Sequence, residues 1–206
     1  LNDPDGDAIC GLVDNCPSVA NTSQLNSDGD LSGDACDACP LDPLNDNDAE
    51  YPALLVANNV FGGGSLSSRL GDRLRQKDGL SYNVGSSIVA DSAPDGRDDD
   101  GQIVIQAIAA PENVTRLDAA LREELARFVR DGITAEELKT SVNSLLTQRR
   151  QNRANDGSIA GLLARNLYMG RTMAWAADFE SKLEALTVDD VNAAIRKHIK
   201  PEALSV

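Results

Sequence analysis

The sequence of 206 residues is poor in histidine and in positive charge, and each shortage excludes a class of protein. The single histidine, His198, leaves no Ser/His/Asp or Cys/His catalytic set and no H-x-x-E-H or H-E-x-x-H motif, so the chain is not a zinc hydrolase on its own. A formal net charge of -14 argues against nucleic acid and against anionic membranes as partners. No apolar run approaches the roughly 18 residues that a membrane span needs, so no span is expected.

Lysine and arginine are absent from the first fifty residues, which hold 12 acidic residues and all four cysteines. Residues 51–206 hold all seven aromatic residues and are nearly balanced in charge, with 21 acidic and 19 basic residues. This contrast predicts two domains, residues 1–50 and residues 51–206. The chain starts inside an aspartate-rich repeat without Met or a signal-peptide pattern, so we expect a longer precursor.

By composition alone the acidic segment would be disordered, because its carboxylates repel one another and it has little apolar material for a core. The order of its residues predicts a Ca²⁺ site instead. The runs Asp3-Pro-Asp5-Gly6-Asp7 and Asn26-Ser-Asp28-Gly29-Asp30 place oxygen atoms on alternate residues, and Ca²⁺ binds roughly six to eight oxygens. Mg²⁺ tends to keep its own waters, so the dense carboxylates favour Ca²⁺. No Glu stands at the twelfth loop position, which excludes an EF-hand.

The cysteines of this segment are Cys10, Cys16, Cys36 and Cys39. An even number favours disulfides, although the sequence leaves three pairings open. Zinc is the alternative, because Cys36 and Cys39 form a C-x-x-C motif. The wider spacing of the other pair and the surrounding carboxylates fit zinc less well than a hard cation. Disulfides would place the segment in an oxidising compartment, either extracellular or periplasmic.

Residues 1–48 resemble the thrombospondin type 3 repeat. The resemblance is carried by Asp14-Asn15-Cys16-Pro17, by Asp28-Gly29-Asp30 and by Gly33-Asp34-Ala35-Cys36-Asp37. In that family irregular repeats wrap around calcium ions, so the resemblance implies a calcium-stabilised, disulfide-bonded segment with little regular structure. Carried over residue by residue, the implied calcium ligands are Asp3, Asp5, Asp7, Asp14, Asn26, Asp28, Asp30, Asp34 and Asp37.

Residues 51–206 show the patterns of several helices and two strands. The strands are expected at 80–90 and 102–109, where β-branched residues are flanked by Gly and Asp. A helix after Pro111 carries an apolar stripe, and capping boxes at Thr134 and Thr187 begin two more helices. We therefore predict an α+β fold in which helices pack on a small antiparallel sheet.

Arg75 and Tyr82 are the candidate functional pair of this second domain. Arg75 stands at the end of an expected helix, Tyr82 begins the following strand, and Gly79 lies in the turn between them. A guanidinium beside a phenol would form a pair of hydrogen-bond donors suited to a peptide carbonyl. The alternative is a surface arginine and a half-buried strand tyrosine without a functional role.

Residues 51–206 also resemble the C-terminal, non-zinc domain of the M16 peptidases, which include pitrilysin, insulin-degrading enzyme (insulinase) and the mitochondrial processing peptidase. The matching motifs are Gly62-Gly63-Gly64, Ser68-Arg69-Leu70, Gly79-Leu80-Ser81-Tyr82 and Asp131-Gly132-Ile133-Thr134. The resemblance implies a non-catalytic domain that forms a peptide chamber with a zinc-bearing domain or subunit.

In that family Arg75 and Tyr82 would contact peptide substrate, and zinc would be held only by the partner. The family domain has further strands before its first helix and after its last, so the sheet of this chain is expected to be truncated. The competing hypothesis is a calcium-binding structural or adhesion module without a peptidase role.

Overall fold

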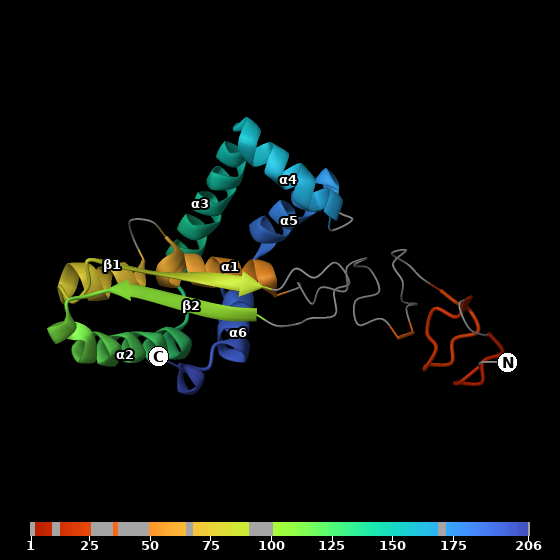
Figure 1. The fold of residues 1–206 in the computed structure, drawn as a ribbon, viewed down its shortest axis with the longest axis horizontal. Coiled ribbons are helices and arrows are strands. Elements are labelled where there is room, and N and C mark those ends of the chain that lie inside the picture. The colour runs from red at the N-terminus through yellow and green to blue at the C-terminus, as the bar shows by residue number, and fades with distance from the viewer. Residues whose placement is uncertain are drawn as a thin grey trace. The chain divides into compact units, whose positions relative to one another are not determined.

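A computed structural model describes residues 3–9, 13–25, 35–36, 50–64, 68–90, 101–168 and 172–205. The chain divides into two compact units, residues 1–48 with 91–100 and residues 49–90 with 101–206. The second unit is a helical domain with a small sheet (Figure 1). In chain order its elements are α1 (Tyr51–Asn58), η2 (Asn59–Gly63), η3 (Gly71–Lys77), β1 (Asn83–Ala90), β2 (Gly101–Ile108), η4 (Pro111–Asn113), α2 (Val114–Asp131), α3 (Ala135–Arg153), α4 (Asp156–Tyr168), α5 (Met173–Ala185), α6 (Val188–His198) and η5 (Pro201–Ala203).

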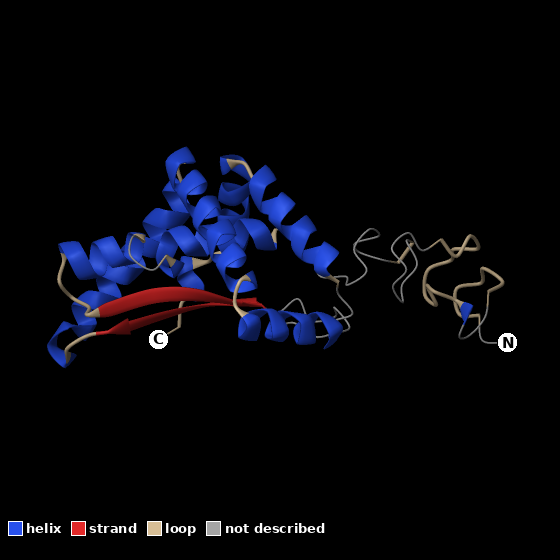
Figure 2. Cartoon of the chain, turned by 90° about the horizontal axis from the view of Figure 1, so that it is seen from above, coloured by secondary structure: helices blue, strands red, loops and turns tan. Residues whose placement is uncertain are grey.

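The sheet of the described residues is an antiparallel pair, β1 with β2, in a register that runs from Asn83 opposite Ile108 to Ala90 opposite Gly101. Both predicted strands are therefore confirmed. β1 begins later than expected, because the backbone N–H groups of Leu80 and Ser81 donate to the carbonyl of Leu74 and not to a strand. Most of the helices lie on one side of the strands (Figure 2).

The hydrophobic core lies between that side of the sheet and the helices α1, η2, α2 and α6. The stripe predicted for the helix after Pro111 is confirmed, since Leu117, Leu121, Leu125 and Phe128 of α2 are all buried. Phe128 packs on Phe61 of η2 with 4.8 Å between the ring centroids. The apolar residues of α2 recur every three to four positions and therefore line one face of the helix, which packs against the core.

Two helix starts form as their sequences predict. The backbone N–H of Glu137 donates to Thr134 Oγ1 at 3.2 Å, and the N–H of Thr134 donates to Glu137 Oε2 at 2.8 Å. Thr187 and Asp190 repeat the arrangement at the start of α6. Each capping box satisfies backbone donors that the first helical turn leaves without partners.

The first helix of this domain is linked to its last helix through Glu50. Glu50 Oε2 accepts hydrogen bonds from Lys197 Nζ at 2.7 Å and from His198 Nε2 at 2.5 Å. These bonds lower the pKa of the Glu50 carboxyl. The only histidine of the chain therefore lies in an exposed hydrogen bond with Glu50 at the end of α6.

Candidate functional site

The two candidate peptide-contact residues stand at the two ends of a closed turn between η3 and β1. The Leu74 carbonyl accepts hydrogen bonds from Leu80 N–H at 2.8 Å and from Ser81 N–H at 3.2 Å. Gly79 has φ +61°, a conformation that favours glycine, and this reverses the chain. Arg75 directly follows Leu74 and Tyr82 directly follows Ser81, so the closed turn carries both.

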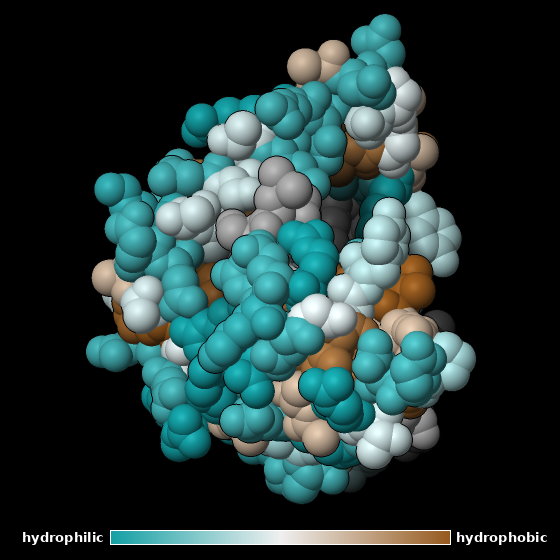
Figure 3. All heavy atoms as spheres, turned by 90° about the vertical axis from the view of Figure 1, so that its left-hand side faces the viewer, coloured by the Kyte–Doolittle hydropathy of each residue, from teal (hydrophilic) through white to brown (hydrophobic). Residues whose placement is uncertain are grey.

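Tyr82 presents its phenol outward from a fixed backbone. Its side chain is 87% exposed, while its N–H donates to the Ile108 carbonyl at 2.9 Å. Arg75 is partly buried on η3. Figure 3 looks at the end of the domain that carries η3, where hydrophilic side chains predominate. Tyr82 thus offers an exposed phenolic donor, and a phenol and a guanidinium both suit a carbonyl oxygen.

Ser81 fixes the backbone next to Tyr82. It is buried, and its hydroxyl lies 2.7 Å from the Asn83 carbonyl and 2.9 Å from the Ile108 carbonyl. These contacts bind the residue before Tyr82 to both strands. The sequence marks Ser81 only as a member of the Gly79-Leu80-Ser81-Tyr82 motif, and no local pattern predicts its positioning role.

Arg69 anchors the segment that leads into η3. Its guanidinium donates to both carboxylate oxygens of Glu137 at 2.8 Å and to the Gly132 carbonyl at 2.7 Å. It also lies over the Phe128 ring, 5.2 Å from the centroid. Burial opposes ionisation of Glu137, but the hydrogen bonds from Arg69 and Thr134 outweigh it and leave the pKa of Glu137 lowered.

A groove of about 560 Å³ lies beside this ion pair, between η3, the end of α2 and the start of α3. It is lined by Arg69, Asp72, Arg73, Lys77, Arg127, Asp131, Thr134 and Glu137. Three of its four cations already have carboxylate partners: Arg69 pairs with Glu137, Arg73 with Asp78 and Glu123, and Arg127 with Glu124. The groove is therefore lined by ion pairs. Two of them join three helical segments, because Arg69 reaches α3 from the segment that leads into η3 and Arg73 of η3 reaches α2.

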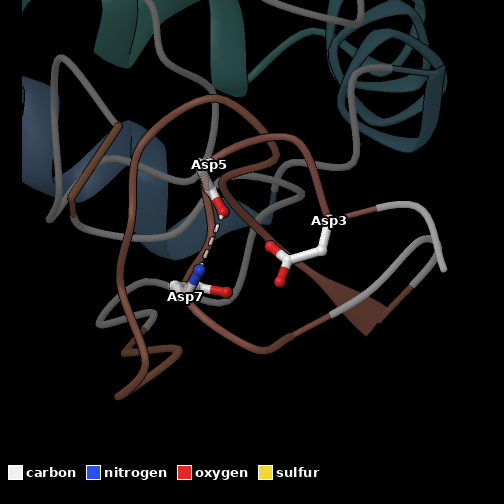
Figure 4. Close-up of side chains that lie close together, drawn as sticks. All are labelled: Asp3, Asp5 and Asp7. Carbon is white, nitrogen blue, oxygen red and sulfur yellow. Dashed lines mark hydrogen bonds between the residues drawn. The ribbon is translucent and has the colours of Figure 1, made fainter.

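In the acidic unit, three predicted calcium ligands converge on one space (Figure 4). Carboxylate oxygens of Asp3, Asp5 and Asp7 lie within 4.8 Å of one another. Loss of water around Asp5, together with the negative charges of Asp7 and Asp14, raises the pKa of Asp5. Such crowding of carboxylates suits a hard divalent cation, which would offset their mutual repulsion.

Asp14 is buried, and one of its oxygens receives no hydrogen bond from the part of the chain that the structure describes. Its Oδ1 accepts from the Cys16 N–H at 2.9 Å, whereas Asp14 Oδ2 and Asp5 Oδ2 are buried without a hydrogen bond among the described residues. A buried oxygen without a donor is costly, and a bound cation would satisfy it. The other predicted ligands, Asn26, Asp28, Asp30, Asp34 and Asp37, lie outside the described residues.

A disulfide joins Cys16 to Cys36, one of the pairs that the sequence leaves open. Both cysteines are thereby removed from the zinc site that the C-x-x-C motif would allow, because zinc ligands are thiolates. Cys10 and Cys39 lie outside the described residues. The bond connects positions separated by 20 residues.

Comparison with known proteins identifies the family. The model of the peptidase M16 inactive domain matches residues 34–145. The uncharacterized zinc protease YmxG of Bacillus subtilis is 38% identical over 88 residues, which is 43% of this chain and 20% of that protein. The chain thus spans a small part of that relative.

Solved structures agree with this match. The M16 inactive domain from Pseudomonas fluorescens superimposes with a TM-score of 0.64 and 26% identity, over 76% of this chain and 35% of that chain. The periplasmic protease PqqL from Escherichia coli shares the fold, with a TM-score of 0.58 and 20% identity over 72% of this chain and 16% of that chain. The chain therefore belongs to the peptidase M16 inactive domain family.

Proposed function

We propose that the helical domain forms the non-catalytic side of a peptide-binding chamber whose other side is a zinc-bearing M16 domain or subunit. The observation that most directly supports this proposal is the closed turn, which holds Arg75 and exposes Tyr82 in a domain with the M16 inactive fold. The chain has no zinc-binding motif of its own, so the partner would supply the metal and the hydrolytic step. Peptide is the proposed substrate.

Within such a chamber the two side chains would act as positioned donors. The Tyr82 hydroxyl and the Arg75 guanidinium both donate hydrogen bonds, and each suits a carbonyl oxygen that gains negative charge during hydrolysis. Ser81 would fix the direction of Tyr82 through its contacts to both strands. The role of this chain would therefore be to orient the peptide and to stabilise charge.

Mixing the protein with a zinc-bearing M16 subunit tests this role. We expect Tyr82→Phe and Arg75→Ala each to lower kcat/KM for a fluorogenic peptide by roughly a hundredfold, as the loss of one charge-stabilising donor does in other enzymes. Arg150→Ala is the matched control, because Arg150 is an exposed arginine on α3. If both variants still assemble with the zinc-bearing subunit and their kcat/KM is unchanged, the proposed peptidase role is wrong.

We further propose that the acidic unit binds Ca²⁺ in the manner of thrombospondin type 3 repeats. Support comes from the convergence of Asp3, Asp5 and Asp7 and from the buried oxygens of Asp5 and Asp14 that receive no hydrogen bond from the described residues. These four residues, together with the predicted ligands Asn26, Asp28, Asp30, Asp34 and Asp37, would surround the ions. Ca²⁺ would then neutralise much of the charge that otherwise opposes a compact segment.

Calcium titration checks this proposal. We expect Ca²⁺ to slow proteolysis within residues 1–50 and to stabilise the unit by about 2.7 kcal/mol at a free concentration of a hundred times Kd. Asp5→Asn should weaken binding about tenfold by removing ligand charge, whereas Asp178→Asn on α5 should not. Mg²⁺ serves as the ion control, and unaltered proteolysis at millimolar Ca²⁺ would contradict the proposal.

The proposed cellular location rests on the acidic unit. The Cys16–Cys36 disulfide supports an extracellular or periplasmic location, and PqqL is a periplasmic protease. None of the helices in the described ranges is both long and apolar enough to cross a bilayer.

If Ca²⁺ binds but the Arg75 and Tyr82 variants stay fully active, a calcium-stabilised structural or adhesion module becomes the better assignment.

A further inference from the structure

The small sheet has one open edge, which belongs to β2. β1 has neighbours besides β2, because it packs on α1, η2 and η3, and its Ser86 carbonyl accepts a hydrogen bond from Asn58 Nδ2 of α1 at 3.4 Å. Among the described strands β2 pairs with β1 alone (Figure 1). An edge strand leaves every second backbone N–H and C=O group without a partner in the sheet, so it can accept a further strand.

β2 lacks the features that usually protect an edge strand from pairing. Charged side chains and proline are common means of preventing two edges from meeting, and residues 102–108 contain neither. Ile103 and Ile105 pack against the core but are only half-buried, so part of their apolar surface still faces water. A strand placed beside β2 would cover that surface and would satisfy the free backbone groups of the edge.

The sequence of β2 is complementary to itself. Residues 102–106 read Gln-Ile-Val-Ile-Gln, which is the same in both directions. When two copies pair antiparallel about a two-fold axis at Val104, each glutamine lies opposite a glutamine and each isoleucine lies opposite an isoleucine. Side chains opposite one another in such a pair have Cβ atoms about 4.5–5.5 Å apart. The glutamine amides can then exchange hydrogen bonds, and the isoleucines can pack together on the core side of the strands.

We propose that the β2 edge binds the β2 edge of a second copy of this chain and so joins two antiparallel strand pairs into one continuous sheet. The contact is isologous, because Gln102 of each copy meets Gln106 of the partner subunit. Association stops at a dimer, since the pair uses the open edges of both copies and leaves none for a third. The proposal depends neither on the peptide chamber nor on the calcium site.

Sedimentation velocity of the full chain over a range of protein concentrations tests the proposal. We expect a monomer–dimer equilibrium with a Kd on the order of 10 µM, because a single strand edge is a small interface. Gln102→Lys with Gln106→Lys sets lysines opposite one another in the pair and should raise this Kd about tenfold or more. Gln102→Lys with Gln106→Glu sets a lysine opposite a glutamate, so the Kd should stay within about threefold of the wild-type value.

A mixing experiment separates strand pairing from a general effect of charge. The protein with Gln102→Glu and Gln106→Glu should dimerise poorly alone, but it should form a heterodimer with the double-lysine protein. Asn143→Lys with Gln148→Lys is the matched control, because these exposed residues of α3 add the same charge outside the sheet. Its Kd should equal that of the wild type. Circular dichroism of each variant checks that the helical domain is folded.

Three results would overturn the inference. The first is a wild-type chain that stays monomeric at about twenty times the expected Kd. The second is a dimer whose Kd is unaffected by the two lysines, which would assign the association to another surface, such as the exposed Leu163 and Leu167 of α4. The third is a lysine–glutamate protein that dimerises no better than the double-lysine protein, because antiparallel pairing at Val104 requires the opposite charges to meet.

Discussion

Replacing Gly132 with alanine should destabilise the helical domain by roughly 3 kcal/mol or more. Gly132 ends α2 with φ 68° and ψ -161°, a region that essentially only glycine occupies. A Cβ atom there would lie 2.3 Å from Asn192 Oδ1. That oxygen accepts a hydrogen bond from the Ile133 N–H at 2.7 Å, so the new methyl group would displace the contact between the α2–α3 turn and α6.

Chemical denaturation followed by circular dichroism measures this loss. Gly161→Ala on α4 is the matched control, because a Cβ at that position meets nothing within 4 Å. We expect it to stabilise by up to about 1 kcal/mol, the difference in helix propensity between glycine and alanine. A Gly132→Ala protein within 1 kcal/mol of the wild type would show that the turn relaxes and that our reading of Gly132 is wrong.

Gly62→Ala should destabilise the helical domain by about 1 to 3 kcal/mol, the range seen when a packed core receives an extra methyl group. Gly62 lies in η2, where a Cβ would approach Ser86 Oγ to 2.5 Å, Ser86 N to 2.7 Å and Leu70 Cδ1 to 2.9 Å. One of these atoms belongs to the backbone of β1, so the strand itself would have to move. The bond from Ser86 Oγ to Asn58 Oδ1 at 2.7 Å would be disturbed as well.

A second variant separates the side-chain clash from the backbone clash. Ser86→Ala in the Gly62→Ala protein removes the hydroxyl but leaves the Ser86 nitrogen in place, so it should recover only part of the stability. Full recovery would assign the whole cost to the hydroxyl. Gly63→Ala should cost less, because the nearest atom to its Cβ is the flexible amide end of Asn58 at 2.6 Å. Equal losses in all three proteins would contradict the packing argument.

Local patterns predicted the parts of this fold that depend on neighbours in the chain. The capping box at Thr134 needs only Glu137, three residues away, and the stripe of α2 follows from helical periodicity. The two strands lie close in sequence and pair as a hairpin. The closed turn before Tyr82 could be anticipated from Gly79.

Contacts between residues that are far apart in the sequence could not be predicted from local patterns. Arg69 pairs with Glu137 across 68 residues, and Asn192 bonds to Ile133 across 59 residues. Polar groups of these types are common on helix surfaces, so nothing local marks which of them meet. The alternating aspartates of the acidic unit predicted the approach of Asp3, Asp5 and Asp7. The partner of Cys16 could not be predicted, because four cysteines allow three pairings.

The contact of Glu50 with Lys197 and His198 has a consequence for how the helical domain responds to acid. Glu50 stands directly before α1 and the two basic residues end α6, so the contact joins segments that are 147 and 148 residues apart in the chain. The pKa of the Glu50 carboxyl is lowered in the folded domain, chiefly by the hydrogen bond from Lys197, so the stability that this contact contributes is present at neutral pH and is lost as the pH falls through that lowered pKa. The join between α1 and α6 is therefore a place where acid loosens the domain.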